Sequence, residues 1–473
     1  MPTALASTPE VPTVVPGLPS APRAAPRWLR AVADVRPGEA AVALTLSLTV
    51  FLLLTAYYVL KVAREPLILL GGGAEVKAYA AAGQALLLVG VLKVYEGVAR
   101  RLGRLALLVV VLTFFALDLV LFAAAVGAGL PVGIPFYLWV GIFSVTVLAA
   151  FWSFANDVYG PEQGKRLFAL LGAGSSVGAV AGAALARALA RFVGPAGLML
   201  FAAGLLMVCL GLFALVHRRL GGEKTGAGAE RAGAPLGRES GLELLLRDRY
   251  LLLIGVLALL RNWVNSTGEY VLDRTLVAAA PELAAAAHVS TTRFISEFKA
   301  DYFGAVNVLG VLCQFFLASR VIKHLGVGRA LLVLPAVALV GNAFMASFPV
   351  LALVRGAKVV ENSVDYSLQN TAGNALYLVT SRDAKYKAKA FIDAFLMRAG
   401  DALGAAAIWA GSHLGWSTAV FARVDLVLCL VWIGVALAIH HRYAVLSGSE
   451  SPAPLSLPVR RARAVVAREA LAA

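Results

Sequence analysis

Long apolar stretches dominate the chain, and only short polar segments separate most of them. Twelve stretches have the roughly 20 mostly apolar residues that a helix needs to cross a bilayer. Their centres lie near Val50, Leu87, Thr113, Ser144, Ala179, Leu206, Leu259, Val308, Ala336, Asp365, Ala402 and Cys429. The stretches are continuous and do not alternate between apolar and polar positions, as the strands of a membrane barrel do. The pattern therefore predicts an all-α polytopic membrane protein with twelve transmembrane helices.

The polar segments divide the chain into five predicted parts. Residues 1–38 are rich in Pro, Ala and Arg and have no apolar core, which predicts a disordered cytoplasmic arm and not a signal peptide. The longest polar interruption predicts a cytoplasmic linker at 218–247. We therefore expect one six-helix bundle at 39–217, a second at 248–441, and a cytoplasmic tail at 442–473.

Short sequences recur between the two halves. The Tyr-Val-Leu sequence at 58–60 returns at 270–272, and the basic segment at 165–168 resembles the one at 387–391. Two parallel six-helix repeats are the organisation of major-facilitator transporters. We therefore expect the two bundles to adopt a major-facilitator-like arrangement.

Composition and charge placement agree with a membrane location. Of the 473 residues, 60% are hydrophobic and only 15% are charged, whereas soluble domains carry about 25% charged residues. A net charge of +15 would point to nucleic acid in a soluble protein. Here most of the 42 Lys and Arg residues fall in alternate segments between the spans and at both ends, which is the positive-inside pattern. We therefore expect the protein to lie in the cell inner membrane with both termini in the cytoplasm. Its expected partner is the lipid bilayer, and we expect no nucleic-acid partner.

Ionisable residues inside the spans are the candidate functional residues, because they are costly there and usually mark a site or pathway. In the tenth span a polar stripe with a spacing of three or four residues contains Arg355, Lys358, Asn362, Asp365 and Gln369, with Glu361 beside it. This stripe predicts the wall of a water-filled cavity. Internal pairing of Lys358 with Glu361 at i, i+3 is the structural alternative.

Three other spans carry comparable polar faces. These faces contain Lys61, Arg64 and Glu65 in the first span, Arg261, Asn265 and Glu269 in the seventh, and Asp393 and Arg398 in the eleventh. The structural alternatives are extension of Arg64 to the membrane surface and one buried Arg–Asp pair among Asp393, Arg398 and Asp401. We expect the cations to meet an anionic solute. The carboxylates would bind its other end, carry protons, or pair with the cations in the empty state.

Catalytic and metal-binding motifs do not accompany these residues. No HExxH or CxxC sequence occurs, so we expect no enzyme activity, no metal and no cofactor. A GxxxGxxxG spacing runs from Gly174 to Gly182. It predicts close packing against another helix and not a phosphate loop.

Three segments of the chain resemble the ATP/ADP translocase family of plastids and intracellular bacteria, together with its wider bacterial relatives. These segments are residues 57–67 with 72–75, residues 151–157 with 165–168 and the Gly-rich span, and residues 365–368 with 385–401. The resemblance implies a twelve-span, major-facilitator-like transporter that exchanges ATP for ADP. It adds Asn156, Lys387 and Lys389 to the candidate solute-binding residues and supports Arg64 and Glu269.

The chain departs from the proven exchangers in two places. After residues 365–368 the exchangers carry Pro-Thr-Lys-Glu, where this chain continues with Gln369, and their Gly-Lys is Gly400-Asp401 here. A triphosphate needs several cationic donors, so the chain resembles the wider bacterial relatives more closely than the exchangers.

Together these observations predict a secondary transporter and antiporter that moves a nucleotide, such as ATP or ADP, or a related anionic metabolite by alternating access. A proton-coupled transporter of another anionic or zwitterionic metabolite is one alternative. A membrane protein without transport activity is the other.

Overall fold

The computed structural model describes residues 36, 39–99, 101–159, 161–219, 240–381 and 383–448. Within these ranges all regular secondary structure is helical, as the sequence predicts. The predicted arm at 1–38, apart from Arg36, and the predicted tail beyond residue 448 lie outside the described residues.

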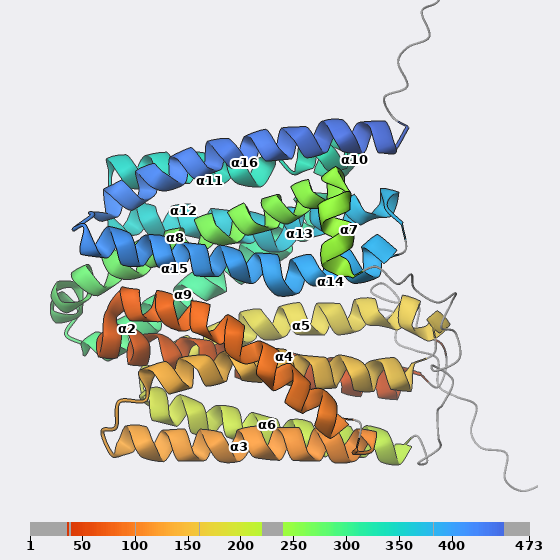
Figure 1. The fold of residues 1–473 in the computed structure, drawn as a ribbon. Helices are drawn as coiled ribbons and strands as arrows, with labels where there is room; N and C mark the ends of the chain where they lie inside the picture. The colour runs from red at the N-terminus through yellow and green to blue at the C-terminus, as the bar shows by residue number, and fades with distance from the viewer. Residues whose placement is uncertain are drawn as a thin grey trace, which may run out of the picture.

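The first half of the chain forms a group of helices that lie beside one another (Figure 1). They are α2 (Ala40–Ala99), α3 (Arg104–Gly127), α4 (Gly133–Val158), α5 (Pro161–Leu189) and α6 (Pro195–Arg219). Helix α2 bends at Gly73, whose φ of 77° lies in the left-handed region that favours a residue without a Cβ. The bend separates α2 into two arms, which correspond to the first and second predicted spans.

The second half is more irregular. Its α-helices are α7 (Gly241–Arg247), α8 (Arg249–Ala286), α9 (Thr291–Leu312), α10 (Ser319–Ala330), α11 (Val333–Ser347), α12 (Leu351–Val364), α13 (Asn370–Ala375), α14 (Lys389–Phe391), α15 (Met397–His413) and α16 (Thr418–Leu446). Between them lie π-helical turns η1 (Cys313–Ala318), η2 (Asp365–Gln369), η4 (Ala384–Ala388) and η5 (Ile392–Leu396), and the 3₁₀ turn η3 (Leu376–Val379). Turns of the π type often occur at functional sites. The short α7 occupies the last part of the predicted linker.

Eight helical runs in the described residues are long and apolar enough to cross a membrane. They are Ala40–Tyr95, Leu105–Gly127, Gly133–Val158, Arg166–Leu189, Pro195–Arg219, Arg249–Ala286, Thr291–Ala330 and Thr418–Leu446. Helix α11 is apolar but shorter, and the helices at the predicted tenth and eleventh spans are interrupted by polar residues and π turns. The chain is thus a multi-pass helical protein, and the number of twelve spans stays a prediction.

Two apolar cores hold the helices together. The larger core contains the helices of the first half and the ends of α8, α9 and α15 that face them, and the smaller core lies within the second half, among α8, α11, α13 and α16. In Figure 1, α3 and α6 lie at one edge of the molecule and α11 and α16 at the other. Helices α2, α5, α8, α9 and α15 lie between these edges and form the boundary between the halves.

Helix α5 packs closely against the first arm of α2, as the glycine spacing predicts. A Cβ placed on Gly178 would lie 2.3 Å from the carbonyl oxygen of Phe51, so only glycine fits at this contact. The Thr55 hydroxyl donates to the carbonyl of Gly178 at 3.2 Å, which adds a polar link between the two helices. This packing fixes the position of the arm that carries Lys61, Arg64 and Glu65.

Candidate functional site

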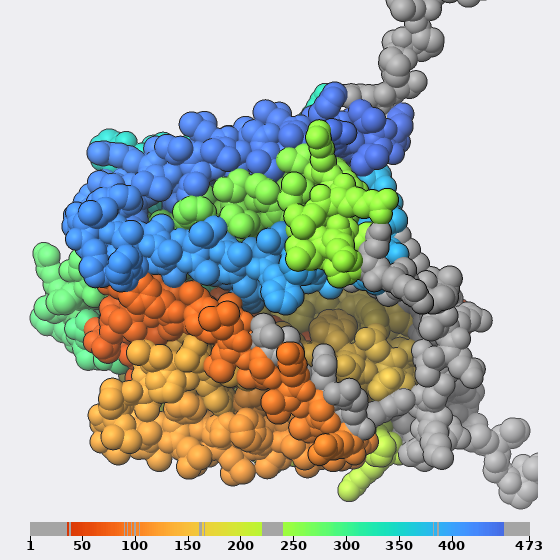
Figure 2. Space-filling model, in the orientation of Figure 1, coloured from red at the N-terminus to blue at the C-terminus, as the bar shows by residue number. Residues whose placement is uncertain are grey.

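A cavity of about 250 Å³ lies between the two halves of the molecule. Its charged lining residues are Lys61, Arg64, Glu65 and Lys77 of α2, Glu269 of α8, Arg398 and Asp401 of α15, and its aromatic ones are Tyr58, Tyr137, Tyr302, Phe303 and Tyr366. In Figure 2 the surface is hollowed between α2 and α15, and atoms of α5 are set back behind this hollow. The cavity is therefore a polar chamber with aromatic walls.

Six of the predicted solute-binding residues line this cavity. They are Lys61, Arg64, Glu65, Asn265, Glu269 and Arg398. They come from the first, seventh and eleventh predicted spans, which lie far apart in the sequence. The polar faces of these spans thus meet in one place.

Lys61 is the unpaired cation of the cavity. Within the described part of the chain, its ammonium makes no hydrogen bond and no ion pair. Instead Nζ lies 4.1 Å from the ring centroid of Phe303 and 5.3 Å from that of Tyr58. Ring faces attract a cation but do not neutralise it. The ammonium therefore faces the cavity without a counter-ion.

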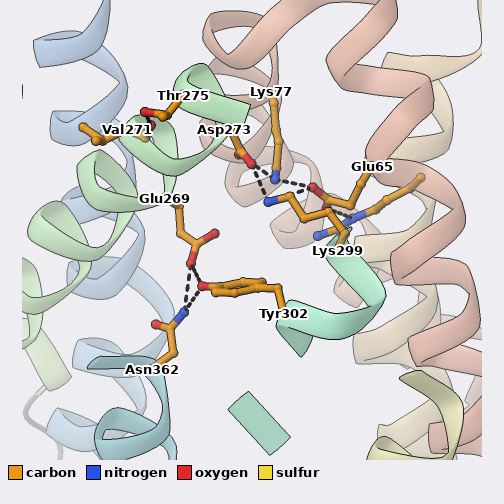
Figure 3. A network of polar contacts seen from close by, with 10 residues as sticks. Glu65, Lys77, Glu269, Val271, Asp273, Thr275, Lys299, Tyr302 and Asn362 are labelled. Atoms are coloured by element: carbon orange, nitrogen blue, oxygen red, sulfur yellow. Dashed lines mark hydrogen bonds and ion pairs between the residues drawn. The ribbon is translucent and has the colours of Figure 1, made fainter. Parts of the chain in front are cut away.

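Glu269 is held by neutral donors. The Tyr302 hydroxyl donates to its Oε1 at 2.5 Å, and Asn362 Nδ2 donates to the same oxygen at 2.8 Å. Figure 3 shows the three side chains converging from α8, α9 and α12. This arrangement orients the carboxylate at the cavity without cancelling its charge by a directly bonded cation.

A four-charge cluster of Glu65, Lys77, Asp273 and Lys299 lies beside the cavity. Lys77 Nζ is 2.5 Å from Glu65 Oε2 and 2.7 Å from Asp273 Oδ2. Lys299 pairs with Asp273 and lies 3.5 Å from Glu65. Two cations and two carboxylates balance one another, which a buried charge requires. Because Glu65 and Lys77 come from the first half and Asp273 and Lys299 from the second, the cluster joins the halves (Figure 3).

The flanking cations of the cavity are also paired. Arg64 Nε is 3.2 Å from Glu65 Oε1, and its guanidinium carbon is 4.4 Å from the ring centroid of Tyr137. Its side chain is only 11% exposed, so it does not extend to the membrane surface. Arg398 pairs with Asp401 at 3.2 Å while both line the cavity.

Four further predicted residues line a second cavity of about 330 Å³ within the second half. They are Arg261, Gln369, Lys389 and Asp393. Arg261 is 3.5 Å from Asp365, and Lys389 is 3.4 Å from Asp393. On α8, Arg261 is one helical turn from Asn265, which lines the central cavity.

The remaining predicted residues lie outside both cavities. Lys358 and Glu361 form a buried ion pair of 2.8 Å, which is the structural alternative that the i, i+3 spacing allowed. Lys358 also donates to Asn265 Oδ1 at 3.1 Å and so contacts the wall of the central cavity from behind. Asn156 is exposed and Lys387 is half-buried.

Four partners in the site were not identified from the sequence, namely Lys77, Asp273, Lys299 and Tyr302, whereas Asn362 belongs to the polar stripe predicted for the tenth span and lines the cavity. For Asp273 a signal was present, because it extends the i, i+4 stripe of Arg261, Asn265 and Glu269 by one more turn. Lys77 and Lys299 lie in polar segments near the starts of the predicted second and eighth spans, where charges usually contact water. Nothing in their spacing identifies their partners.

No family model matches the chain. ADP,ATP carrier protein 1 of Chlamydia pneumoniae is 24% identical over 334 residues. The match covers 61% of this chain and 63% of that protein, so the chain spans less than two thirds of the length of this relative.

Solved transporter structures share the fold. The nucleoside transporter NupG matches with a TM-score of 0.59 at 11% identity, over 86% of this chain and 99% of that one. A bacterial homologue of the iron transporter ferroportin, in its inward-facing state, matches with a TM-score of 0.60 at 12% identity, over 85% and 99%. At these identities the likeness concerns the fold alone. The expected all-helical, major-facilitator-like fold is thus supported, and the similar proteins are transporters, in agreement with the prediction that the chain is not an enzyme.

Proposed function

We propose that the chain is a secondary transporter that moves a small anionic metabolite through the central cavity by alternating access. The observation that carries this proposal is the unpaired Lys61 ammonium, which faces a cavity between two halves of a transporter fold. An unpaired charge away from bulk water is unfavourable. An anionic group that enters the cavity supplies the missing counter-ion.

The balance of charges in the cavity favours one anionic group at Lys61 and a donor at Glu269. Arg64, Lys77 and Arg398 each lie beside a carboxylate, although Arg64 shares Glu65 with Lys77 and Lys299, whereas Lys61 has no carboxylate partner in the described residues. Glu269 accepts from a hydroxyl and an amide and retains its charge. A solute with an anionic group and a hydroxyl or amino donor satisfies both residues.

A nucleotide is the first candidate substrate. The relative is named as an ADP,ATP carrier and one structural neighbour as a nucleoside transporter. Tyr58, Tyr137 and Phe303 line the cavity, and aromatic side chains can stack on a nucleobase. The name of the relative implies that it carries both ADP and ATP, and this chain would likewise exchange one nucleotide for another.

A smaller anionic or zwitterionic metabolite is the second candidate. The cavity of about 250 Å³ is below the roughly 300–1,000 Å³ of pockets for drug-sized ligands. A triphosphate also needs several charge-assisted donors, whereas one cation is unpaired here. Both observations favour a solute with one or two negative charges.

Alternating access would use the contacts that join the halves. Besides the four-charge cluster, Tyr270 donates to Glu75 at 2.8 Å and Tyr58 donates to Asn307 at 2.9 Å, each across the boundary. Each of these bonds would break when the halves separate at its position. We place the protein in the cell inner membrane with both termini in the cytoplasm, on the positive-inside pattern.

Reconstituted transport tests this function and the role of Lys61. Proteoliposomes loaded with ADP are offered labelled ATP, and a parallel series loaded with other anionic metabolites is offered the same labelled metabolite. We expect Lys61→Met to reduce uptake at least tenfold, Lys61→Arg to retain part of it, and Lys93→Met, an exposed lysine of the same helix, to match wild type.

Each outcome has a defined meaning. Wild-type uptake by Lys61→Met would refute the role of Lys61. Exchange of another anion but not of ATP identifies the second candidate, and no transport of any solute by wild type refutes the proposed function.

A further inference from the structure

A buried carboxylate in α16 has no partner. Asp425 is 0% exposed, and within the described residues neither of its carboxylate oxygens accepts a hydrogen bond. Its neighbours along the buried face of α16 are the apolar Phe421, Cys429 and Trp432. None of the contacts described for the central cavity involves this side chain, so the transport site does not explain it.

The charged groups that face Asp425 come from α12. Lys358 and Glu361 both interact with it electrostatically, and they pair with each other at 2.8 Å. Helix α8 contributes Glu269, which acts on Lys358, and the uncharged Asn265. In this cluster two carboxylates, Glu361 and Asp425, thus act on the single ammonium of Lys358, which is bonded to Glu361, and within the described residues no ion pair or hydrogen bond joins Asp425 to either residue.

One ammonium neutralises one carboxylate. If Asp425 and Glu361 were both ionised, the cluster would hold an uncompensated buried charge without a hydrogen-bond donor, which is strongly unfavourable. A protonated Asp425 removes this charge. Because a carboxylic acid is also a donor, it needs an acceptor within the same apolar region.

An unused acceptor is present on the helix that packs against α16. Asn342 of α11 is 1% exposed, and its Oδ1 has no partner within the described residues. Its Nδ2 lies 3.9 Å from the sulfur of Cys429, which is one helical turn from Asp425 on the same face. A buried acceptor thus lies about one turn from the buried acid.

The cluster is connected to the central cavity through Lys358. Its Nζ donates to Asn265 Oδ1, which lines the cavity. At Gly268 an added Cβ would lie 3.0 Å from this Nζ, so the glycine leaves room for the ammonium against α8. A change of charge at Glu361 or Asp425 therefore affects Lys358, and the bond of Lys358 to Asn265 connects this change to the solute site.

We propose that Asp425 is a proton-binding site that couples proton movement to solute movement. In the resting state Asp425 holds the proton and Glu361 is the carboxylate paired with Lys358. When solute movement brings the Asp425 carboxyl within hydrogen-bond distance of Glu361, its proton moves to a Glu361 oxygen, Asp425 becomes the carboxylate and Lys358 pairs with it instead. The charge of the cluster is unchanged, and the reorientation of Lys358 alters its bond to Asn265. The coupling rests on the proposed function, whereas the bound proton does not.

Infrared difference spectroscopy on the purified full chain in detergent tests the bound proton directly. Wild type at neutral pH should show a protonated-carboxyl C=O band that Asp425→Asn lacks. Glu361→Gln should also lack the band, because Lys358 then loses its paired carboxylate and Asp425 ionises to replace it. Glu282→Gln, at an exposed position of α8, should keep it. A band of equal size in wild type and Asp425→Asn would overturn the site.

Proteoliposomes with an imposed pH gradient test the coupling. The side chain of Asp425→Asn is nearly isosteric with the protonated acid, so this variant should fold and exchange solute. It should no longer accumulate solute in response to the pH gradient, and the ratio of solute concentrations inside and outside should fall to one. Accumulation at the wild-type level by this variant would overturn the coupling. If wild type moves no solute, the proposed function and with it the coupling fail, while the infrared result still decides on the proton.

Discussion

Two lysines of helix α2 lie at the boundary between the halves, and only one of them is paired with carboxylates. Lys77, on the second arm, has carboxylate oxygens of Glu65 and Asp273 at 2.5 and 2.7 Å. Lys61, on the first arm, has only the rings of Phe303 and Tyr58. The same residue type on the same helix therefore has two roles. A paired cation holds the halves together, and an unpaired one is available to a solute.

The largest effect is expected from removing the paired lysine. Lys77→Met leaves Glu65 and Asp273 with Lys299 as the remaining lysine between them. Breaking a buried pair typically costs about 3–5 kcal/mol, so we expect a large fall in the free energy of unfolding, measured by thermal or denaturant unfolding in detergent. Lys93→Met is the exposed control on the same helix. Wild-type stability of Lys77→Met would show that the four-charge cluster does not hold the halves.

An intermediate effect, seen only with solute present, is expected from removing the unpaired lysine. Lys61→Met abolishes no ion pair in the empty protein, so its unfolding temperature should equal or exceed that of wild type. A solute at 100 times its dissociation constant stabilises a protein by about 2.7 kcal/mol, and the variant should lose this shift at the same concentration. A marked loss of stability without solute would mean that Lys61 has a structural role.

The smallest effect is expected from a surface pair across the same boundary. Arg187 is 36% exposed and lies 2.9 Å from Asp301. Exposed pairs contribute less than about 1 kcal/mol and are screened by salt. Unfolding of Arg187→Ala at low and high ionic strength should therefore differ little from wild type, and any difference should shrink at high salt. A loss as large as that of Lys77→Met would place the main inter-half contact here instead.

Features that depend on spacing along one helix were predictable from the sequence. The glycine spacing at 174–182 predicts the packing of α5 on α2, and the i, i+3 spacing of Lys358 and Glu361 predicts their ion pair. The polar stripes of the first and seventh spans likewise indicate that Lys61 and Glu269 face a common cavity.

Features that depend on which helices meet were not predictable from one sequence. Lys77 and Lys299 are buried only because α2, α8 and α9 bring Glu65 and Asp273 to them. Asp425 lies in a mostly apolar stretch of α16, and its proposed role depends on Lys358 and Glu361 from another helix. Periodicity gives the face of a helix and not the identity of its neighbour.

The contact between α5 and the first arm of α2 also bears on how the protein is made. Thr55 and Gly178 are 123 residues apart in the chain. At about 5–20 residues per second, a ribosome needs roughly 6–25 seconds to synthesise this interval. During that time the first arm of α2, with its charged residues Lys61, Arg64 and Glu65, is in or near the membrane without the helix that covers it. Early membrane insertion of this protein therefore includes a waiting period in which the arm depends on the insertion machinery or on its other neighbours in the first half.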